Sequence, residues 1–166
     1  SPTTLGNAQR IKNQITLKTI NVKKGTILQQ PNQFNSKGYL VKSGLLRSYS
    51  IDEKGKEHIF MFAPEGWTIA DFAAKDEPTS LFIDVLEDAV LIQAEKNFGQ
   101  IASENVIKLV KRANVLQNRI IMLMSSPAIE RYEHFVKTYP DIIQRVPQKM
   151  IASYLGITPE ALSTVK

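Results

Sequence analysis

The chain has 166 residues, of which 43% are hydrophobic and 22% charged, with a formal net charge of +5 and no cysteine. This composition excludes an intrinsically disordered chain, and the lack of cysteine excludes a disulfide framework, an iron–sulfur or zinc–thiolate site and a thiol nucleophile. No apolar run approaches the roughly 20 residues of a membrane span and residues 1–21 lack the apolar centre of a signal peptide, so we expect a cytoplasmic protein.

The positive charge is concentrated in the C-terminal part of the chain. Residues 1–98 carry 12 Lys/Arg and 11 Asp/Glu, a net charge of +1, whereas residues 99–166 carry 9 and 5, a net charge of +4. A basic patch attracts polyanions such as nucleic acid. On charge alone, an ordinary solvated surface is the better interpretation.

The segment from Leu17 to Ala94 is predicted to form a β domain. Short runs rich in Ile, Val, Phe, Tyr and Leu are separated by polar clusters or by Gly25, Gly38, Gly44, Gly55 and Gly66. Such spacing is typical of a sandwich or barrel. DEKGK at Asp52–Lys56 predicts a hairpin turn, since glycine readily adopts positive φ. Residues 69–78 are expected to form a short helical or looped excursion.

The hydrophobic period changes after Phe98. Apolar residues then recur alternately four and three apart, which predicts a long helix with a dimer seam of Val106, Leu109, Ala113, Leu116, Ile120 and Leu123. A second apolar stripe contains Ile107, Val110, Ile121 and Met124. Two stripes predict two partners, the β domain and a second copy of the helix, although a helix packed only on its own domain is the alternative. Pro127 ends this helix, and another is predicted over about Ala128–Thr138, closed by Pro140.

The sequence QKMIASYLGITPEALSTV, from Gln148, predicts a helix-turn-helix. Gly156 stands where the first helix must end in a left-handed residue. Thr158 can cap the second helix with its hydroxyl, and Pro159 suits the first helical position. The small Ala152 allows two helices to cross closely. A plain helical hairpin is the alternative.

A β domain, a long heptad helix and a terminal helix-turn-helix, in this order, resemble the Crp/Fnr family of bacterial transcription regulators. The resemblance rests on GYLVKSGLLRSYSIDEKGKEHIFMFAPEGW and on ERYEHFVKTYPDIIQRVPQKMIASYLGITPEALS, and the second stretch is especially similar to a Bacteroidetes branch. It implies an α+β chain with a jelly-roll sensor domain like cyclic-nucleotide-binding domains (1–97), a long dimerisation helix (98–126) and a winged helix-turn-helix (127–166). We expect the last to be incomplete, because the helix from Pro159 has only about two turns.

The sensor region departs from the cyclic-nucleotide pattern. Family members that bind cyclic nucleotide use a Gly-Glu pair for the ribose and an Arg about a dozen residues later for the phosphate. Residues 66–89 contain no Arg; Asp71 falls near the ribose position, Ser80 or Leu81 near the phosphate position, and Lys75 on the wrong side of the loop. A buried phosphate without a cation is costly, so we expect no response to cyclic AMP. The pocket is expected to be empty, to hold an unidentified ligand, or to be filled by aromatic rings; the candidate residues are Trp67, Asp71, Phe72, Ser80 and Phe82.

Candidate DNA-contacting residues follow from position on the two helices and are Gln148, Lys149, Thr158, Glu160, Ser163, Thr164 and Lys166. LSTVK stands where the branch often has LSRIR, so Thr164 replaces a basic residue. The implied partners are double-stranded DNA and a second copy of the chain, with RNA polymerase and a small-molecule effector as further candidates.

Catalysis and cofactors are not expected. His58 and His134 are the only histidines and lack the spacing of a metal or haem site. The chain has no Gly-rich phosphate loop, no G-x-S-x-G and no paired-carboxylate motif. The alternative function is a ligand-sensing or protein-interaction module that does not bind DNA and uses its terminal helices for packing.

Overall fold

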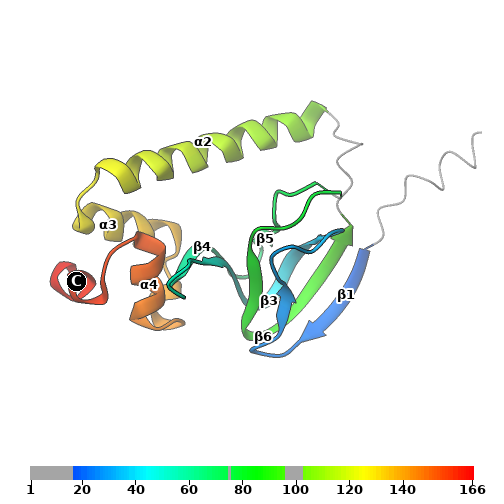
Figure 1. Ribbon diagram of the computed structural model, residues 1–166, viewed down its shortest axis with the longest axis horizontal. Helices are drawn as coiled ribbons and strands as arrows, with labels where there is room; N and C mark the ends of the chain where they lie inside the picture. Colours follow the sequence, from blue (N-terminus) through cyan, green and yellow to red (C-terminus); the bar gives the residue numbers. More distant parts are fainter. Residues whose placement is uncertain (1–16, 75, 96–102) are drawn as a thin grey trace, which may run out of the picture.

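The computed structural model describes residues 17–74, 76–95 and 103–166. In the described ranges the strands are β1 (Leu17–Val22), β2 (Ile27–Gln29), β3 (Lys37–Ile51), β4 (Glu57–Ala63), β5 (Thr68–Ile69) and β6 (Phe82–Glu95). The helices are α2 (Ser103–Ser125), α3 (Ala128–Thr138), the short 3-10 helix η2 (Ile142–Gln144), α4 (Gln148–Leu155) and α5 (Pro159–Val165). Figure 1 shows the strands at one end, α3 to α5 at the other, and α2 running along both.

The strands form a rolled antiparallel sheet in the order β1-β6-β3-β4, with β2 also paired to β6 and β5 to β3. The two long strands, β3 and β6, form the centre of this sheet and pair with each other along most of their length. The interior of the roll is a closely packed apolar cluster that includes Val41, Leu46, Ile69, Ile83 and Leu91. This arrangement agrees with the predicted jelly-roll domain.

The pairing of strands β3 and β6 is irregular around Gly44. The pairing of β3 with β6 shifts register three times between Val41 and Leu46, and Gly44 lies in this stretch with a φ of 95°. A Cβ at Gly44 would lie 2.5 Å from the carbonyl oxygen of Asp88 and 2.6 Å from the Cβ of Ala89. Glycine is therefore required here both for its backbone conformation and for the close approach of the two strands.

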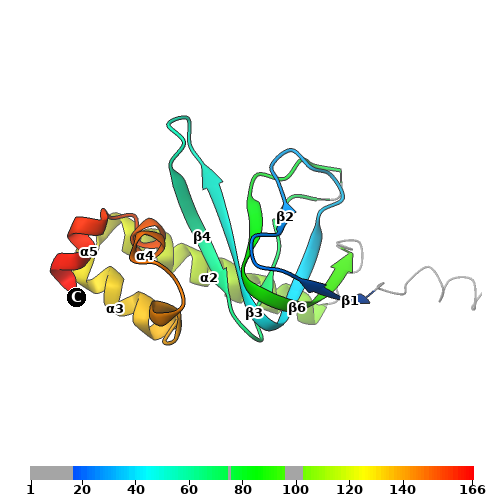
Figure 2. The same ribbon diagram turned by 90° about the horizontal axis from the view of Figure 1, so that it is seen from below.

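A second apolar cluster joins the roll to the C-terminal helices. It contains Phe62 of β4 together with Phe135 and Tyr139 from α3 and its C-terminal end and Tyr154 from α4. The ring of Phe62 lies 5.8 Å from those of Tyr139 and Tyr154 and 6.2 Å from that of Phe135, centroid to centroid. Such aromatic contacts bury large areas in fixed geometry. Figure 2 shows the β3–β4 hairpin projecting between the roll and these helices.

The locally encoded elements lie where the sequence predicts them. The hairpin turn follows β3 and precedes β4, with Gly55 at a φ of 80°. Helix α3 spans Ala128–Thr138, as predicted, and Pro127 precedes it as N-cap. Beyond Ile69, the described residues of the predicted excursion form a loop and not a helix. No helix in the described ranges is both long and apolar enough to cross a bilayer.

Replacing Gly44 by alanine should destabilise the β domain strongly. Because the added Cβ meets backbone and the φ is unfavourable, we expect Gly44→Ala to lower the free energy of unfolding by about 3 kcal/mol or more. Gly55→Ala is the matched control, since Gly55 also has positive φ but no atom within 4 Å of its Cβ position; its cost should be about 1 kcal/mol. Urea denaturation followed by circular dichroism measures both, and equal costs would contradict the close-approach argument.

Candidate nucleic-acid interface and sensor pocket

Helices α4 and α5 form a tight turn with the predicted chemistry. Gly156 has left-handed φ and ψ of 66° and 31°, and the amide of Ile157 donates to the carbonyl of Ala152 at 3.1 Å. The hydroxyl of Thr158 accepts a hydrogen bond from the amide of Ala161 at 3.1 Å, and Pro159 is the first residue of α5. These hydrogen bonds satisfy part of the free backbone groups at the end of α4 and the start of α5 and so help to fix the angle between the helices.

The inner faces of α3, α4 and α5 share one core. Ala152, Leu155, Leu162 and Phe135 are fully or almost fully buried in the same cluster. The small side chain of Ala152 leaves room for the crossing helix, as its position in the sequence predicts. The apolar residues of α5 therefore face the protein, and its polar residues face outward.

All seven candidate DNA-contacting residues are exposed. The hydroxyls of Ser163 and Thr164 donate to carbonyls one turn earlier, those of Pro159 and Glu160, so their protons are engaged within α5. The donors presented to solvent on this surface are therefore mainly those of Gln148, Lys149 and Lys166. Because phosphate oxygens need donors, these three suit phosphate contacts better than the hydroxyls do.

The β3–β4 hairpin adds a cation to this surface. A groove of about 400 Å³ lies between the hairpin and the helices, and its lining includes Lys56, Glu57, Lys149, Thr158 and Glu160. Nothing in the sequence groups Lys56 with Lys149, because only the docking of α4 on β4 brings them to the same groove.

Strand β4 is an edge of the sheet, and side chains of the C-terminal helices satisfy its backbone. Ser153 donates through its hydroxyl to the carbonyl of Glu57 at 2.9 Å and accepts from the amide of Ile59 at 3.0 Å. Tyr139 donates to the carbonyl of Phe62 at 3.0 Å and accepts from the amide of the same residue at 3.3 Å. Burial raises the pKa of the Tyr139 phenol, which therefore stays protonated and able to donate.

Arg119 joins α2 to the same strand. Its guanidinium donates to the carbonyl of Phe60 and lies 3.9 Å from the ring centroid of Tyr154. Burial lowers the pKa of Arg119, because desolvation disfavours the charged form. Three helical elements thus meet on β4, one through each of Ser153, Tyr139 and Arg119.

Arg145, which follows η2, connects the helices to β3, to β6 and to the residues just after β4. It binds a carboxylate oxygen of Glu87 at 2.8 Å and one of Glu65 at 3.0 Å, and it donates to the carbonyl of Gly44 at 3.1 Å. The hydrogen bond from Arg145 lowers the pKa of Glu65. A planar guanidinium suits several acceptors at once, so one residue connects three points of the β domain.

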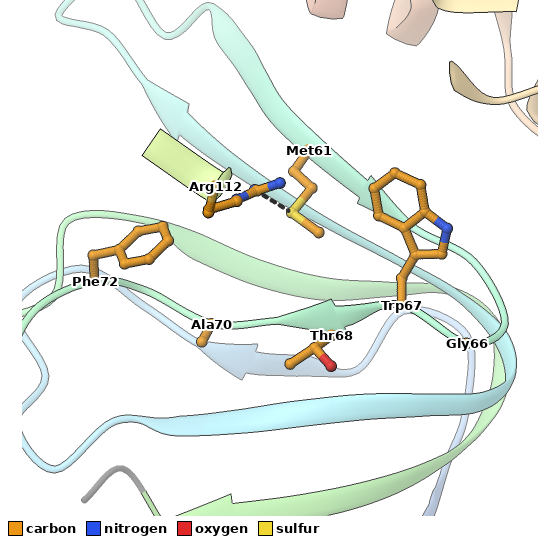
Figure 3. Close-up of a pocket in the computed structure, with 7 residues that line it drawn as sticks. All are labelled: Met61, Gly66, Trp67, Thr68, Ala70, Phe72 and Arg112. Carbon is orange, nitrogen blue, oxygen red and sulfur yellow. Dashed lines mark hydrogen bonds between the residues drawn. The ribbon is translucent and has the colours of Figure 1, made fainter. Parts of the chain in front are cut away.

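The β domain has a cavity of about 480 Å³ between the roll and α2 (Figure 3). Its lining consists of Met61, Gly66, Trp67, Thr68, Ala70, Phe72 and Arg112. The predicted Trp67 and Phe72 are among these residues, whereas Asp71, Ser80 and Phe82 are not. Figure 3 shows Arg112 entering from α2, so a cation reaches the pocket from a helix and not from the loop whose sequence lacks one.

The three predicted residues outside the lining have other partners. The buried carboxylate of Asp71 accepts from the backbone amides of Ser80 and Leu81, each at 3.0 Å, and from that of Ala73 at 2.8 Å. The ring of Phe82 stacks on that of Tyr49, with centroids 5.1 Å apart. Asp71 and Ser80 therefore bind each other, and Phe82 belongs to the core beneath the helices. Lys75 lies outside the described residues.

The predicted dimer seam is divided between two surfaces. Leu116 and Leu123 are half-buried and line a groove with Phe60 of β4. Ile120 lies at the edge of the same groove but is exposed, as are Leu109 and Ala113. Val110, Ile121 and Met124 of the second stripe are also exposed. Arg112 and Arg119 point toward the roll, and this rotation of α2 turns part of both stripes outward. The side chains of Val106 and Ile107 are outside the part of α2 whose side chains the structure describes.

Among the residues that the structure describes, no three potential metal ligands are close enough to hold an ion. His58 is exposed and lies 2.8 Å from a carboxylate oxygen of Asp52 across the hairpin turn. His134 is exposed on α3. Both positions are those of ordinary surface residues.

Solved structures of the same architecture are numerous. FixK2 from Bradyrhizobium japonicum superposes with a TM-score of 0.73 at 19% identity, over 90% of this chain and 82% of that one. A Crp/Fnr-family transcriptional regulator from Thermus thermophilus gives 0.66 at 17% identity, over 89% and 83%. The chain has the fold of the Crp/Fnr transcription regulators. A regulator assigned to this family from Eubacterium rectale gives a TM-score of 0.64 at 19% identity, over 98% of this chain and 81% of that one.

At these identities the likeness establishes the Crp/Fnr fold alone. No protein-family model and no curated protein matches the chain by sequence. The predicted order of sensor roll, long helix and helix-turn-helix is that of the Crp/Fnr fold, and the predicted fold class is confirmed.

The contacts of Arg145 predict a pH dependence of stability. Because Arg145 lowers the folded-state pKa of Glu65 below its ordinary value of 4.5, this contribution is present above that pH and is lost as the pH falls through the folded pKa. Glu65 is about half exposed, so the contribution should be below about 1 kcal/mol. Arg145→Gln should therefore lose less stability than the unmodified chain between about pH 5 and pH 3, as measured by urea denaturation. Lys18→Gln, in the remote strand β1, should leave the profile unchanged; an identical profile for Arg145→Gln would contradict the assignment.

Proposed function

We propose that the chain is a dimeric DNA-binding transcription regulator. The observation that carries the proposal is the turn at Gly156, Thr158 and Pro159, which joins two helices with a shared buried face and an exposed polar outer face. The Crp/Fnr fold of the chain supports it, since regulators of that fold are the proteins that the structure resembles. In a helix-turn-helix, the second helix enters the major groove and the first crosses the backbone.

Each exposed residue then has a role that follows from its chemistry. Gln148 and Lys149, at the start of α4, would bind phosphate oxygens and so fix the position of the helices on the duplex. On α5, Glu160 can accept from cytosine, and Lys166 can bind guanine or phosphate. Ser163 and Thr164 already donate their hydroxyl protons within α5, so their contribution would be smaller, whereas the hydroxyl of Thr158 accepts there and can still donate to a phosphate.

Dimerisation would use the exposed apolar face of α2. Leu109, Val110, Ile120, Ile121 and Met124 are all exposed on this one helix. Contiguous apolar surface of this kind is typical of an interaction site. A two-fold dimer through α2 would carry two copies of α5, which fits a roughly palindromic DNA site.

The regulator would not respond to cyclic AMP. Residues 66–89 supply no Arg for a cyclic phosphate. The backbone amides of Ser80 and Leu81, near the position of that phosphate, already donate to Asp71. A second anion beside this buried carboxylate would be repelled.

DNA binding is tested by recovering genomic fragments bound by the protein and titrating salt on the best fragment. We expect an enriched, roughly palindromic site whose affinity falls steeply with salt, because binding releases counterions. Lys149→Gln should weaken binding about threefold to tenfold and reduce the salt slope by about 1, whereas Lys18→Gln in β1 should do neither. A folded protein that binds no DNA under any of these conditions would favour a sensing or interaction module that uses its terminal helices for packing.

Charges on the exposed face of α2 should prevent dimerisation. We expect the double variant Leu109→Glu, Ile120→Glu to sediment as a monomer while remaining folded, because both side chains are exposed in the protomer and only a partner would bury the carboxylates. Val115→Glu is the matched control: Val115 has the same 57% exposure as Ile120 but lies on another face of α2. Sedimentation velocity decides, and a double variant that remains dimeric would exclude this interface.

A further inference from the structure

Arg112 enters the sensor cavity without an acidic partner. Its only hydrogen bond among those of the described residues is from Nη2 to the sulfur of Met61, at 3.4 Å, and none of the ion pairs in the described ranges includes it. A thioether is a weak acceptor, and a guanidinium has five N–H donors. A cation placed in this way can bind an anion in the cavity.

The loop that carries Asp71 already binds an anion of the chain itself, outside the lining of the cavity. The amides of Ser80, Leu81 and Ala73 already donate to the buried carboxylate of Asp71, and the side-chain amide of Gln29 lies 3.4 Å from the same carboxylate. The chain thus supplies its own anion at this position. Among the described residues that line the cavity, Arg112 is the only charged one, so an anion in the cavity would pair with Arg112.

The remainder of the cavity is suited to an apolar body. Trp67 and Phe72 contribute aromatic surface, and Met61 and Ala70 contribute aliphatic and sulfur atoms. Phe72 is 56% exposed although it is a large apolar residue, so a ligand over its ring would remove apolar surface from water. The volume of about 480 Å³ is in the range of small-molecule sites.

We propose that the sensor cavity binds a small apolar or aromatic molecule with one anionic group, which pairs with Arg112 while the body lies against Trp67 and Phe72. That this ligand acts as an effector rests on the proposed function; the binding itself does not. Arg112 and Arg119 project from one face of α2, two turns apart, and Arg119 contacts both β4 and Tyr154 of α4. A ligand that holds Arg112 would therefore act on the helix that contacts the DNA-binding unit.

Trp67 provides the measurement, because it is the only tryptophan of the chain and lines the cavity. The full chain is titrated with 4-phenylbutyrate, with its neutral amide 4-phenylbutyramide, with 3-phenylpropylphosphonate and with cyclic AMP, and tryptophan fluorescence is recorded. We expect a saturable change with the carboxylate or the phosphonate at an affinity at least about tenfold above that of the amide, as a charge-assisted hydrogen bond provides. The better of the two anions identifies the anionic group, and cyclic AMP should give no saturable change.

Two variants locate the anion. Arg112→Gln should reduce the preference for anion over amide to less than about twofold. Lys111→Gln removes the same charge from the preceding position of α2, where the side chain is exposed and does not line the cavity. This control should leave the preference for anion over amide intact. The proposal is overturned if no anion changes Trp67 fluorescence up to about 10 mM, if amide and anion bind equally, or if folded Arg112→Gln retains the preference.

DNA binding by the same proteins separates this inference from the proposed function. An Arg112→Gln variant that loses the anion preference but still binds the recovered DNA site supports both the ligand assignment and the proposed regulator. A chain that prefers the anion but binds no DNA keeps the ligand assignment and rejects the regulator. A chain that binds DNA but shows no anion preference keeps the regulator and rejects the ligand class.

Discussion

Strand β4 is an edge strand whose backbone groups must find partners outside the sheet, and the arrangement of the molecule depends on how they do so. An exposed edge would pair readily with other strands. Here Ser153, Tyr139 and Arg119 donate to or accept from β4 in place of a neighbouring strand. These residues come from α4, from the end of α3 and from α2, so satisfying one strand also places the three helices.

The same contacts connect the two candidate sites. Helix α2 carries Arg112 into the sensor cavity and Arg119 onto β4 and Tyr154, and Tyr154 belongs to the first helix of the helix-turn-helix. Arg145 ties the segment between α3 and α4 to Glu65 and Glu87 of the roll. A displacement of α2 relative to the roll would therefore change contacts that hold α4. In this way the proposed ligand site would be coupled to the proposed DNA site.

The cavity between the roll and α2 and the loop that carries Asp71 hold charges of opposite sign. The amides of the loop bind an internal carboxylate, Asp71, and the available cation, Arg112, lies across the cavity on α2. The loop thus holds a negative charge of the chain, whereas the positive charge at the cavity comes from α2. The aromatic surface of Trp67 and Phe72 is the reason that the proposed ligand has an apolar body.

The sequence by itself determined the features that depend on neighbouring residues. The hairpin at Gly55, helix α3 between its flanking prolines, and the turn at Gly156, Thr158 and Pro159 were all predictable, because each is fixed by local backbone geometry and hydrogen bonds within a few residues. Only the tertiary structure decided which face of α2 is covered, that Arg112 reaches the cavity, and that Lys56 lies in the groove with Lys149. These outcomes depend on how α2 is rotated and how α4 docks on β4. The rotation of α2 and the docking of α4 are both set by contacts between residues far apart in the chain. The hydrophobic pattern within one segment does not reveal such contacts.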